Sequence, residues 1–270
     1  QLPSGSAVVI WTTTPWTLPA NLAIAISPRH DYMVREFCKD GQSRTLVMAV
    51  ERAADFAAAT GWQPAGEERL IPGTALEGTR TRHPFLDRQA PVFAADFVTM
   101  DTGTGCVHIA PGHGADDFHL GNARGLDILC PVDDLGRFTT ECGVADWVGK
   151  PVFEANPLVV EHLRTRGALL GAAPYQHSYP HCWRSKTPII FRTVEQFFIR
   201  IDALRPDALR AIGETHWIPD WGGKRITGTV ESRPDWCISR QRSWGVPLPV
   251  FYTPEGQPVL DAALVRRVAD

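Results

Sequence analysis

The chain has 270 residues, of which 44% are hydrophobic and 21% charged, as in an ordinary soluble globular protein with one large domain or two smaller ones. The formal net charge of −3 excludes a generally basic nucleic-acid-binding coat but leaves room for a local basic patch. No apolar run approaches the roughly 20 residues of a membrane span, so no membrane partner is expected. Residues 1–5 contain neither an initiator methionine nor a signal core, and we expect a piece of a longer polypeptide.

The first predicted strand, residues 7–10, leads into a threonine-rich segment at residues 11–21. That segment reads Trp-Thr-Thr-Thr-Pro-Trp-Thr-Leu-Pro-Ala-Asn. Proline biases the residue before it towards extended conformations, so the segment is predicted to be rigid and not helical. By itself it is also typical of a β-branched strand with solvated hydroxyls.

Most of the remaining elements are predicted within the first 170 residues. Asp116 and Asp117 favour the first turn of a helix that follows a short glycine-flanked strand and ends at Gly125. A later helix is predicted with Asn156 as its N-cap and Gly167 as its stop. The other predicted elements are strands at 22–26, 32–37, 45–50 and 91–98, a helix at 51–60, and loops with short strands at 64–88. The mixture predicts an α/β (mixed) fold class.

The chain changes character near residues 172–174, beyond which Trp, Arg and Pro are frequent. We therefore predict two domains, residues 1–173 and residues 174–270. None of the six cysteines forms a Cys-x-x-Cys pair, and a chain of this length does not need disulfides. Reduced thiols in a cytoplasmic protein are therefore expected.

Several catalytic classes lack their motifs in this sequence. There is no Gly-x-Ser-x-Gly elbow and no Gly-x-x-x-x-Gly-Lys phosphate loop. Cys106 and His108 are compatible with a nucleophile and base, or with buried strand residues. The histidines and aspartates between residues 108 and 119 are dense enough to consider zinc, but they fall on a strand and a helix without a His-Glu-x-x-His motif. No metal is predicted.

The remaining polar residues suggest non-covalent chemistry. A carboxylate suits an ammonium group, and hydroxyls suit ribose oxygens and a bound water. This set could position a water and a polar, positively charged substrate. Its members are three hydroxyls, an amide, an imidazole and a carboxylate: Thr12, Thr13, Thr14, Asn21, His108 and Asp117.

The threonine-rich segment and a second motif, Gly-Thr-Gly-x-Val-His-x-Ala-Pro-Gly-His-Gly-x-Asp-Asp, together resemble the editing insertion of isoleucyl-tRNA synthetases, in class I. Residues 177–184 and 233–247 resemble the segments that follow that insertion and return to the catalytic domain. The three threonines before proline favour the isoleucyl family over its valyl and leucyl relatives, where an Arg-Pro version is expected. The resemblance implies a β-barrel-like editing domain with surrounding helices, followed by a connecting segment and the start of the second half of the catalytic domain.

The resemblance also implies hydrolysis of the ester in mischarged valyl-tRNA(Ile). One methylene is worth only about 1–3 kcal/mol, for which isoleucine against valine in this family is the standard example, so a second and smaller site is needed. By the resemblance, Asp117 would bind the α-ammonium group, and His108 and Thr12 would line the pocket that limits side-chain size. Catalysis is expected from positioning and hydrogen bonding, with a substrate ribose hydroxyl as a further candidate. The terminal adenosine and the attacking water would be positioned by Thr13, Thr14 and Asn21.

The alternative is a non-catalytic tRNA-binding module, to which Asp117 would be dispensable. Arg80, Arg82 and Arg88 are candidates for contacts with tRNA phosphates, or for a solvated loop. Structural or surface roles, rather than chemical ones, are expected for His113, Asp116 and His119.

No His-Ile-Gly-His signature and no Lys-Met-Ser-Lys-Ser loop occur, so this chain is not expected to activate isoleucine. ATP and magnesium are expected only for a full-length enzyme, and no cofactor is expected for editing. The expected partners are the 3′ end of tRNA(Ile) carrying valine and the rest of the synthetase chain. The protein is expected to be a monomer.

Overall fold

A computed structural model describes residues 2–240 and 245–270 of the chain. It divides into two compact units, Gln1–Thr193 and Val194–Asp270. The functional boundary that the sequence predicts between residues 173 and 174 stays a prediction. Part of the segment at 233–247 that carried the resemblance, residues 241–244, lies outside the described residues.

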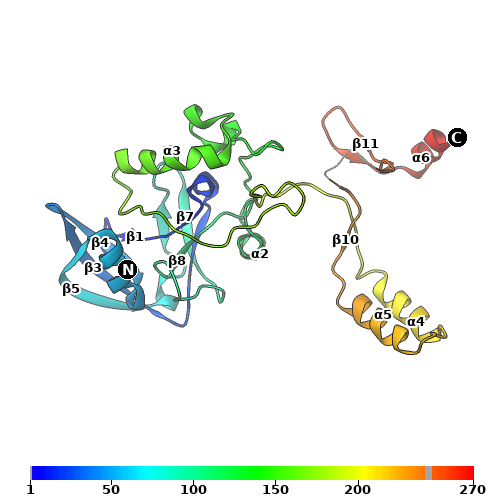
Figure 1. Ribbon diagram of the computed structural model, residues 1–270, viewed down its shortest axis with the longest axis horizontal. Coiled ribbons are helices and arrows are strands. Elements are labelled where there is room, and N and C mark those ends of the chain that lie inside the picture. Colours follow the sequence, from blue (N-terminus) through cyan, green and yellow to red (C-terminus); the bar gives the residue numbers. More distant parts are fainter. Residues whose placement is uncertain (1, 241–244) are drawn as a thin grey trace. The chain divides into compact units, whose positions relative to one another are not determined.

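The first sheet of unit Gln1–Thr193 has the strand order β1-β4-β3-β5, with β1 parallel to β4 and the other pairs antiparallel (Figure 1). A two-residue turn joins β3 to β4, and its residues Asp40 and Gly41 have φ of 48° and 75°. Helix α1 ends at Gly61, which takes the left-handed conformation. The elements are β1 (Ala7–Val8), β3 (Asp31–Lys39), β4 (Gln42–Ala49), η2 (Val50–Arg52), α1 (Ala53–Thr60) and β5 (Gln63–Pro72).

Strand β5 corrects the prediction of loops and short strands at 64–88, because its ten residues form one continuous strand. Only Ile71 of that strand is buried. Its residues are mostly exposed on both faces, so no apolar alternation marks it in the sequence, and pairing with β3 stabilises it instead.

The second sheet has the order β6-β7-β2-β8, with β2 parallel to β7 and antiparallel to β8. All four residues of β2 are buried, which explains its continuous apolar sequence. Both four-stranded sheets are open, so the strands do not close into a barrel, although the mixed α/β class is confirmed. The elements are β2 (Ala23–Ile26), η3 (Gly73–Leu76), β6 (Arg80–Arg82), β7 (Gln89–Ala94) and β8 (Cys106–Ile109).

The threonine-rich segment contains a 3₁₀ helix, η1 (Pro15–Ala20), so the prediction of a wholly non-helical segment is wrong. Pro15 occupies the first helical turn, where its missing N–H costs nothing. Thr14 lies outside the helix with φ −124° and ψ 67°. The turns are closed by bonds from Thr17 N to Thr14 O (3.0 Å) and from Asn21 N to Leu18 O (2.9 Å).

Helix α3 (Val152–Thr165) begins four residues before the predicted N-cap. Pro151 precedes it, and Asn156 lies inside it, where its Oδ1 accepts a hydrogen bond from Trp16 N (3.1 Å). The N-cap prediction is therefore wrong, because Asn156 serves the start of η1 rather than the start of its own helix. The predicted helix after the glycine-flanked strand is confirmed as α2 (Ala115–Ala123). Two short helices, η4 (Thr140–Cys142) and η5 (Ala145–Trp147), precede α3.

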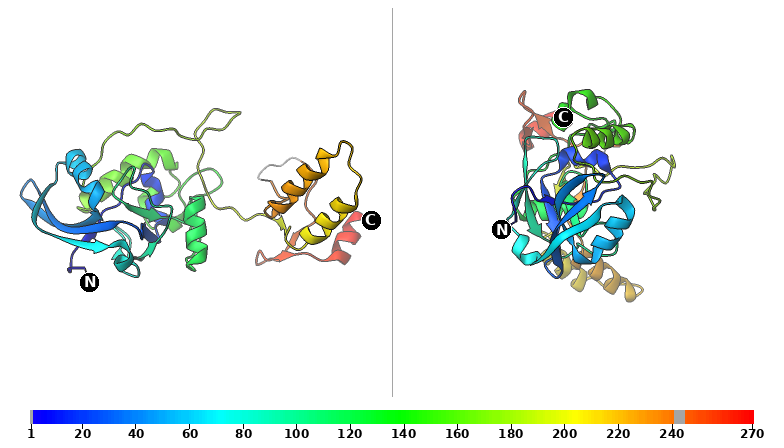
Figure 2. Two further views of the ribbon diagram at one scale, coloured as in Figure 1. Left: turned by 90° about the horizontal axis from the view of Figure 1, so that it is seen from below. Right: turned by 90° about the vertical axis from the view of Figure 1, so that its left-hand side faces the viewer.

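The core of unit Gln1–Thr193 consists of neighbouring apolar clusters. One joins Trp16 and Leu18 of η1 to Val152 and Val159 of α3. Another joins Phe56 of α1 to β3 and β4. Figure 2 shows α1 and α3 beside the strands of this unit. Helix η1 is thus held in the core, which positions the threonines before it.

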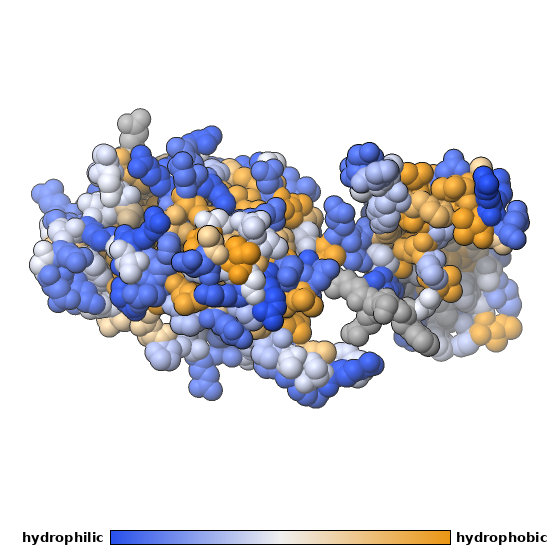
Figure 3. All heavy atoms as spheres, turned by 90° about the horizontal axis from the view of Figure 1, so that it is seen from above, coloured by the Kyte–Doolittle hydropathy of each residue, from blue (hydrophilic) through white to orange (hydrophobic). Residues whose placement is uncertain are grey.

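The described residues of unit Val194–Asp270 contain no buried side chain. Its helices α4 and α5 lie side by side (Figure 2), and orange apolar groups reach its surface in Figure 3. The exposed large side chains of this unit include Ile218, Leu260, Trp221 and Trp236. Its elements are β9 (Phe198–Ile199), α4 (Arg205–Glu214), α5 (Trp221–Glu231), β10 (Trp236–Cys237), β11 (Phe251–Tyr252), β12 (Pro258–Val259) and α6 (Ala262–Ala269).

All six cysteines lie among the described residues, and none of them forms a disulfide bond there. Within residues 2–240 and 245–270, none of the helices has the length and apolar character that crossing a membrane requires.

Candidate functional site

The three threonines lie between β1 and η1, and each is partly buried. Thr12 folds back onto the chain, where its Oγ1 accepts a hydrogen bond from Thr14 N (3.0 Å). The hydroxyls of Thr12 and Thr14 lie 3.4 Å apart. The hydroxyl of Thr13 makes no hydrogen bond within the described part of the chain, so it is the one with both donor and acceptor capacity left for a ligand.

Thr17 connects this segment to β8, although the sequence-based prediction did not include it. Its hydroxyl donates to Thr14 O (2.8 Å), and its Oγ1 lies 3.1 Å from His108 Nε2. Since the hydroxyl proton is used towards Thr14, we assign the second contact to an Nε2–H donor on His108. The Nδ1 atom of His108 then carries a lone pair, and it is buried without a hydrogen-bond partner in the described part of the chain.

His108 is a neutral side chain at physiological pH. It lies on β8, where it is 8% exposed and paired in register with Ile24 of β2. Burial, with smaller contributions from the neighbouring His113 and His83, lowers its pKa to about 4. An imidazole with so low a pKa is a weak base, so it suits shape and hydrogen bonding better than proton abstraction.

Asp117 lies in the first turn of α2, and its Oδ2 accepts a hydrogen bond from Ala110 N (3.0 Å). Its pKa is raised to about 6, mainly by burial; the charge of Asp116 contributes to the rise and the hydrogen bond from Ala110 N opposes it. Asp117 forms no ion pair among the described residues. A half-buried carboxylate without a cation is costly, and an incoming ammonium group would remove that cost.

Asn21 is buried at the end of η1, where its Nδ2 donates to Ala23 O (2.8 Å). Arg88 Nη1 donates to Pro19 O (3.1 Å) and Asn21 O (3.0 Å). His83 Nε2 lies 2.9 Å from Leu18 O. Arg88 therefore binds carbonyl groups of this segment rather than forming a solvated loop, and no local pattern in the sequence indicated either partner.

Gly112 and His113 form the turn between β8 and α2. A Cβ atom on Gly112 would lie 2.2 Å from Leu129 O, so only glycine allows this backbone approach. His113 is buried, its Nδ1 lies 3.0 Å from Phe191 O, and its ring packs edge-on against Trp16 at 4.9 Å between centroids. This packing agrees with the structural role that the sequence predicts for His113.

Hydrogen bonds thus join Thr12, Thr14 and His108 through Thr17. Asp117 is attached to the residue that follows β8, and the backbone next to Asn21 is bonded to the same strand, from Leu22 N to Ile109 O (2.9 Å). The side chain of Thr13 forms no hydrogen bond to this network among the described residues. Asp116 and His119 are exposed. Among the residues that the structure describes, no group of three His, Cys, Asp or Glu could hold a metal ion.

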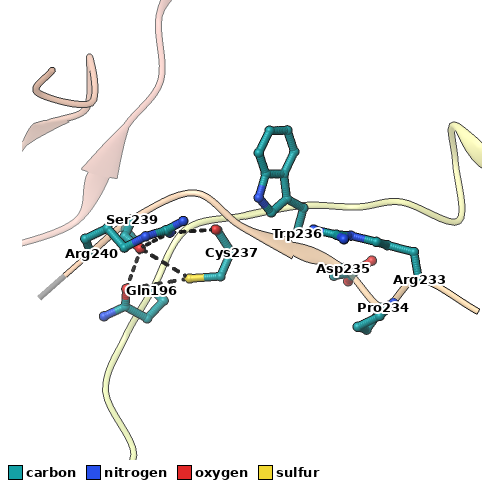
Figure 4. A pocket seen from close by; sticks show the side chains of 8 residues that line it. All are labelled: Gln196, Arg233, Pro234, Asp235, Trp236, Cys237, Ser239 and Arg240. Atoms are coloured by element: carbon teal, nitrogen blue, oxygen red, sulfur yellow. Dashed lines mark hydrogen bonds between the residues drawn. The ribbon is translucent and has the colours of Figure 1, made fainter. Parts of the chain in front are cut away.

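Unit Val194–Asp270 has a separate open pocket, shown in Figure 4. Gln196 Oε1 accepts from Ser239 Oγ (2.6 Å) at one wall, and Arg240 Nη1 donates to Cys237 O and Ser239 O (2.8 Å each). It lies on the segment at 233–247 that resembles the return to a catalytic domain. None of the predicted site residues belongs to it.

The chain belongs to the class I tRNA synthetases (I, L, M and V), whose family pattern it matches over residues 2–269. Its relatives include isoleucine–tRNA ligases from Methylacidiphilum infernorum (isolate V4), 49% identical over all of this chain and 29% of that protein, and Desulforudis audaxviator (strain MP104C), 49% identical over 92% and 26%. The predicted resemblance to isoleucyl-tRNA synthetases is confirmed. The chain spans less than a third of the length of these relatives.

Solved structures with a similar arrangement include the editing domains of the cytosolic leucyl-tRNA synthetases of P. knowlesi and P. falciparum. The first has a TM-score of 0.47 and 12% identity over 60% of this chain and 82% of that one. The second has a TM-score of 0.48 and 12% identity over 62% and 80%.

Proposed function

We propose that this chain hydrolyses the ester bond of valine misattached to tRNA(Ile). The observation that carries the proposal is Asp117, a desolvated carboxylate that is held by the Ala110 N–H and forms no ion pair with any residue that the structure describes. An aminoacyl ester presents an α-ammonium group, which supplies the missing charge. The identity of 49% to isoleucine–tRNA ligases supports this choice of substrate class.

The reaction needs little beyond positioning. Water adds its oxygen to the ester carbonyl carbon, the bond from that carbon to the ribose oxygen breaks, and a proton passes to the ribose. Asp117 would hold the amino acid through its ammonium group, and Thr13, Thr14 and Asn21 would orient the terminal adenosine and the water. Because the low pKa of His108 makes it a weak base, water activation would rely on hydrogen bonds, including those of the substrate ribose.

Selection against isoleucine would come from a rigid pocket wall. His108 and Thr12 would limit the side chain to the size of valine. Thr17 bonds both to His108 and to the backbone of Thr14, so the wall is coupled to the core through η1. A wall flexible enough to admit one more methylene could not separate valine from isoleucine, because the binding free energies of the two side chains differ by only about 1–3 kcal/mol.

The test is deacylation of valyl-tRNA(Ile) by the wild-type chain and by Asp117→Ala. We expect the variant to lose at least about tenfold in kcat/KM, since a charge-assisted contact contributes roughly 1.5–3 kcal/mol. Asp116→Ala is the matched control, because it removes the adjacent, exposed carboxylate and should retain activity. Unchanged hydrolysis by Asp117→Ala would contradict the site, and binding of tRNA without hydrolysis by the wild-type chain would favour a non-catalytic tRNA-binding module.

The proposal extends to a full-length synthetase of the same family. The partners would be the valine-carrying 3′ end of tRNA(Ile) and the rest of a synthetase chain, in a monomeric enzyme of the cytoplasm. ATP and magnesium would be needed for aminoacylation by the full-length enzyme, and editing would need no cofactor. Deacylation that survives exhaustive chelation would agree with this last point.

A further inference from the structure

The stretch from His162 to Val194 differs in charge from the rest of the chain. It contains five Arg and Lys residues and no Asp or Glu, in a protein whose net charge is −3. Arg164 and Arg192 are paired with Glu161 and Asp134. Arg166, Arg184 and Lys186 form no ion pair within the described residues, so this stretch is a local basic surface.

Aromatic rings follow one another along the same stretch. Tyr175 packs edge-on against Trp11 with 5.0 Å between ring centroids. From Tyr175 the rings continue through alternate residues, with centroid separations of 5.7 Å to His177, 5.8 Å to Tyr179 and 6.3 Å to His181. Tyr175 is 53% exposed and Trp11 is 40% exposed, so the row reaches solvent. We call these five residues the ring row.

The ring row begins next to the candidate site, because Trp11 directly precedes Thr12. Further along the row, Tyr179 packs against Phe153 of α3 with 6.0 Å between ring centroids. Beyond the row, Thr193 N donates to Gly112 O (2.8 Å), in the turn that leads to Asp117.

We propose that the ring row, with Arg184 and Lys186, binds the unpaired nucleotides at the 3′ end of a tRNA. This assignment rests on the proposed function for its direction, since the row ends at the threonines that would hold the terminal adenosine. Exposed aromatic rings stack on bases only where the bases are unpaired, and cations beside them bind the phosphates. An acidic peptide would account for the cations but not for the row of rings.

The test measures binding of a short labelled single-stranded RNA with the sequence of the tRNA(Ile) 3′ end to the 270-residue chain. Tyr175→Ala and Tyr179→Ala should each weaken binding about tenfold, which is within the range for losing one stacked base. Tyr175→Phe keeps the ring and should restore affinity to near the wild-type value. Phe97→Ala, which removes a partly exposed ring outside the row, is the matched control and should not change affinity.

Equal affinity of the wild-type chain and Tyr175→Ala for this RNA, including no measurable binding by either, overturns the proposal. So does preference for duplex RNA or for an acidic peptide over the single strand. Because the probe carries no amino acid, this result is independent of hydrolysis. If the ring row binds RNA but the proposed function is wrong, RNA binding will depend on Tyr175 while valyl-tRNA(Ile) is not cleaved. If both hold, Tyr175→Ala mainly raises KM, whereas Asp117→Ala lowers kcat/KM without weakening binding of the uncharged RNA.

Discussion

At the scale of single residues, the ionised carboxylate of Asp117 lowers the stability of the fold, whereas the proposed activity requires it. Its pKa is raised to about 6 from 3.8, so the folded protein holds this proton more tightly than the unfolded chain does. Between about pH 4 and pH 6 the unfolded state loses the proton first, and stability therefore falls as pH rises through this window. Above pH 6 the cost of an ionised, desolvated carboxylate is present in full.

Replacing Asp117 by Asn should therefore stabilise the protein at neutral pH. The amide oxygen can still accept the Ala110 N–H, and the buried charge is gone. We expect the free energy of unfolding to rise by up to about 3 kcal/mol at pH 7.5 and to change little at pH 4, measured by urea denaturation. Asp116→Asn, at the exposed neighbour, should show no such pH-dependent gain. An equal effect of Asp117→Asn at both pH values would contradict the argument.

The same pKa predicts the pH profile of deacylation. The ammonium contact needs the charged carboxylate, so kcat/KM for valyl-tRNA(Ile) should fall as pH decreases through about 6. His108 is neutral above about pH 4 and should add no inflection between pH 5 and 8. A pH–rate profile of the wild-type chain measures this, and a flat profile down to pH 5 would count against Asp117.

His108→Ala should change selectivity rather than abolish hydrolysis. The substitution removes a buried ring from the proposed pocket wall, and the added space would admit one more methylene. We expect the ratio of isoleucyl-tRNA(Ile) to valyl-tRNA(Ile) deacylation to rise by about tenfold, within the range that one methylene allows. The size-filter role is wrong if His108→Ala still leaves the isoleucyl ester intact.

At the scale of elements, η1 is held by side chains from distant parts of the chain. Asn156 of α3 accepts the Trp16 N–H, and His83 and Arg88 contact carbonyl oxygens of the segment. A helix of six residues leaves most of its terminal backbone groups without internal partners, so these contacts stabilise it.

Asn156→Ala should loosen η1 by leaving the Trp16 N–H without its acceptor. We expect a loss of about 1–3 kcal/mol in the free energy of unfolding, reduced by a few tenths because Ala is the better helix former. Asn156→Asp keeps an oxygen acceptor and should lose less. Urea denaturation of both variants measures the difference, and equal losses would show that the hydrogen bond is not the cause.

The strands also show which signals in the sequence were sufficient to predict secondary structure. Strands β2, β3 and β4 were predicted because their apolar runs are signals carried by neighbouring residues. The length of β5 was not, since its exposed residues carry no alternation.

At the scale of the whole molecule, the buried core lies in one unit. Every apolar cluster of buried residues belongs to Gln1–Thr193, and no described residue of Val194–Asp270 is buried. Burial of apolar surface is the main favourable contribution to folding, so the two units should differ greatly in stability. The relatives are more than three times as long as this chain.

Residues 1–193 expressed alone should fold cooperatively and keep the deacylase activity of the whole chain. Residues 194–270 alone should lack a cooperative thermal transition and bind a dye specific for exposed apolar surface. Circular dichroism on heating and dye fluorescence measure both expectations. A sharp unfolding transition of 194–270 would contradict them.

The sequence by itself determined the mixed α/β class, most strands, and the similarity to isoleucyl-tRNA synthetases, because apolar patterning, turn residues and long motifs are properties of neighbouring residues. It also nominated Asp117 and His108, whose roles stay proposals. Only the tertiary structure decided the helical form of η1, the place of Asn156 and the bonding of His108 to Thr17. The physical reason is distance along the chain: the Thr17–His108 and Trp16–Asn156 contacts join residues 91 and 140 positions apart, and burial by the whole fold lowers the pKa of His108.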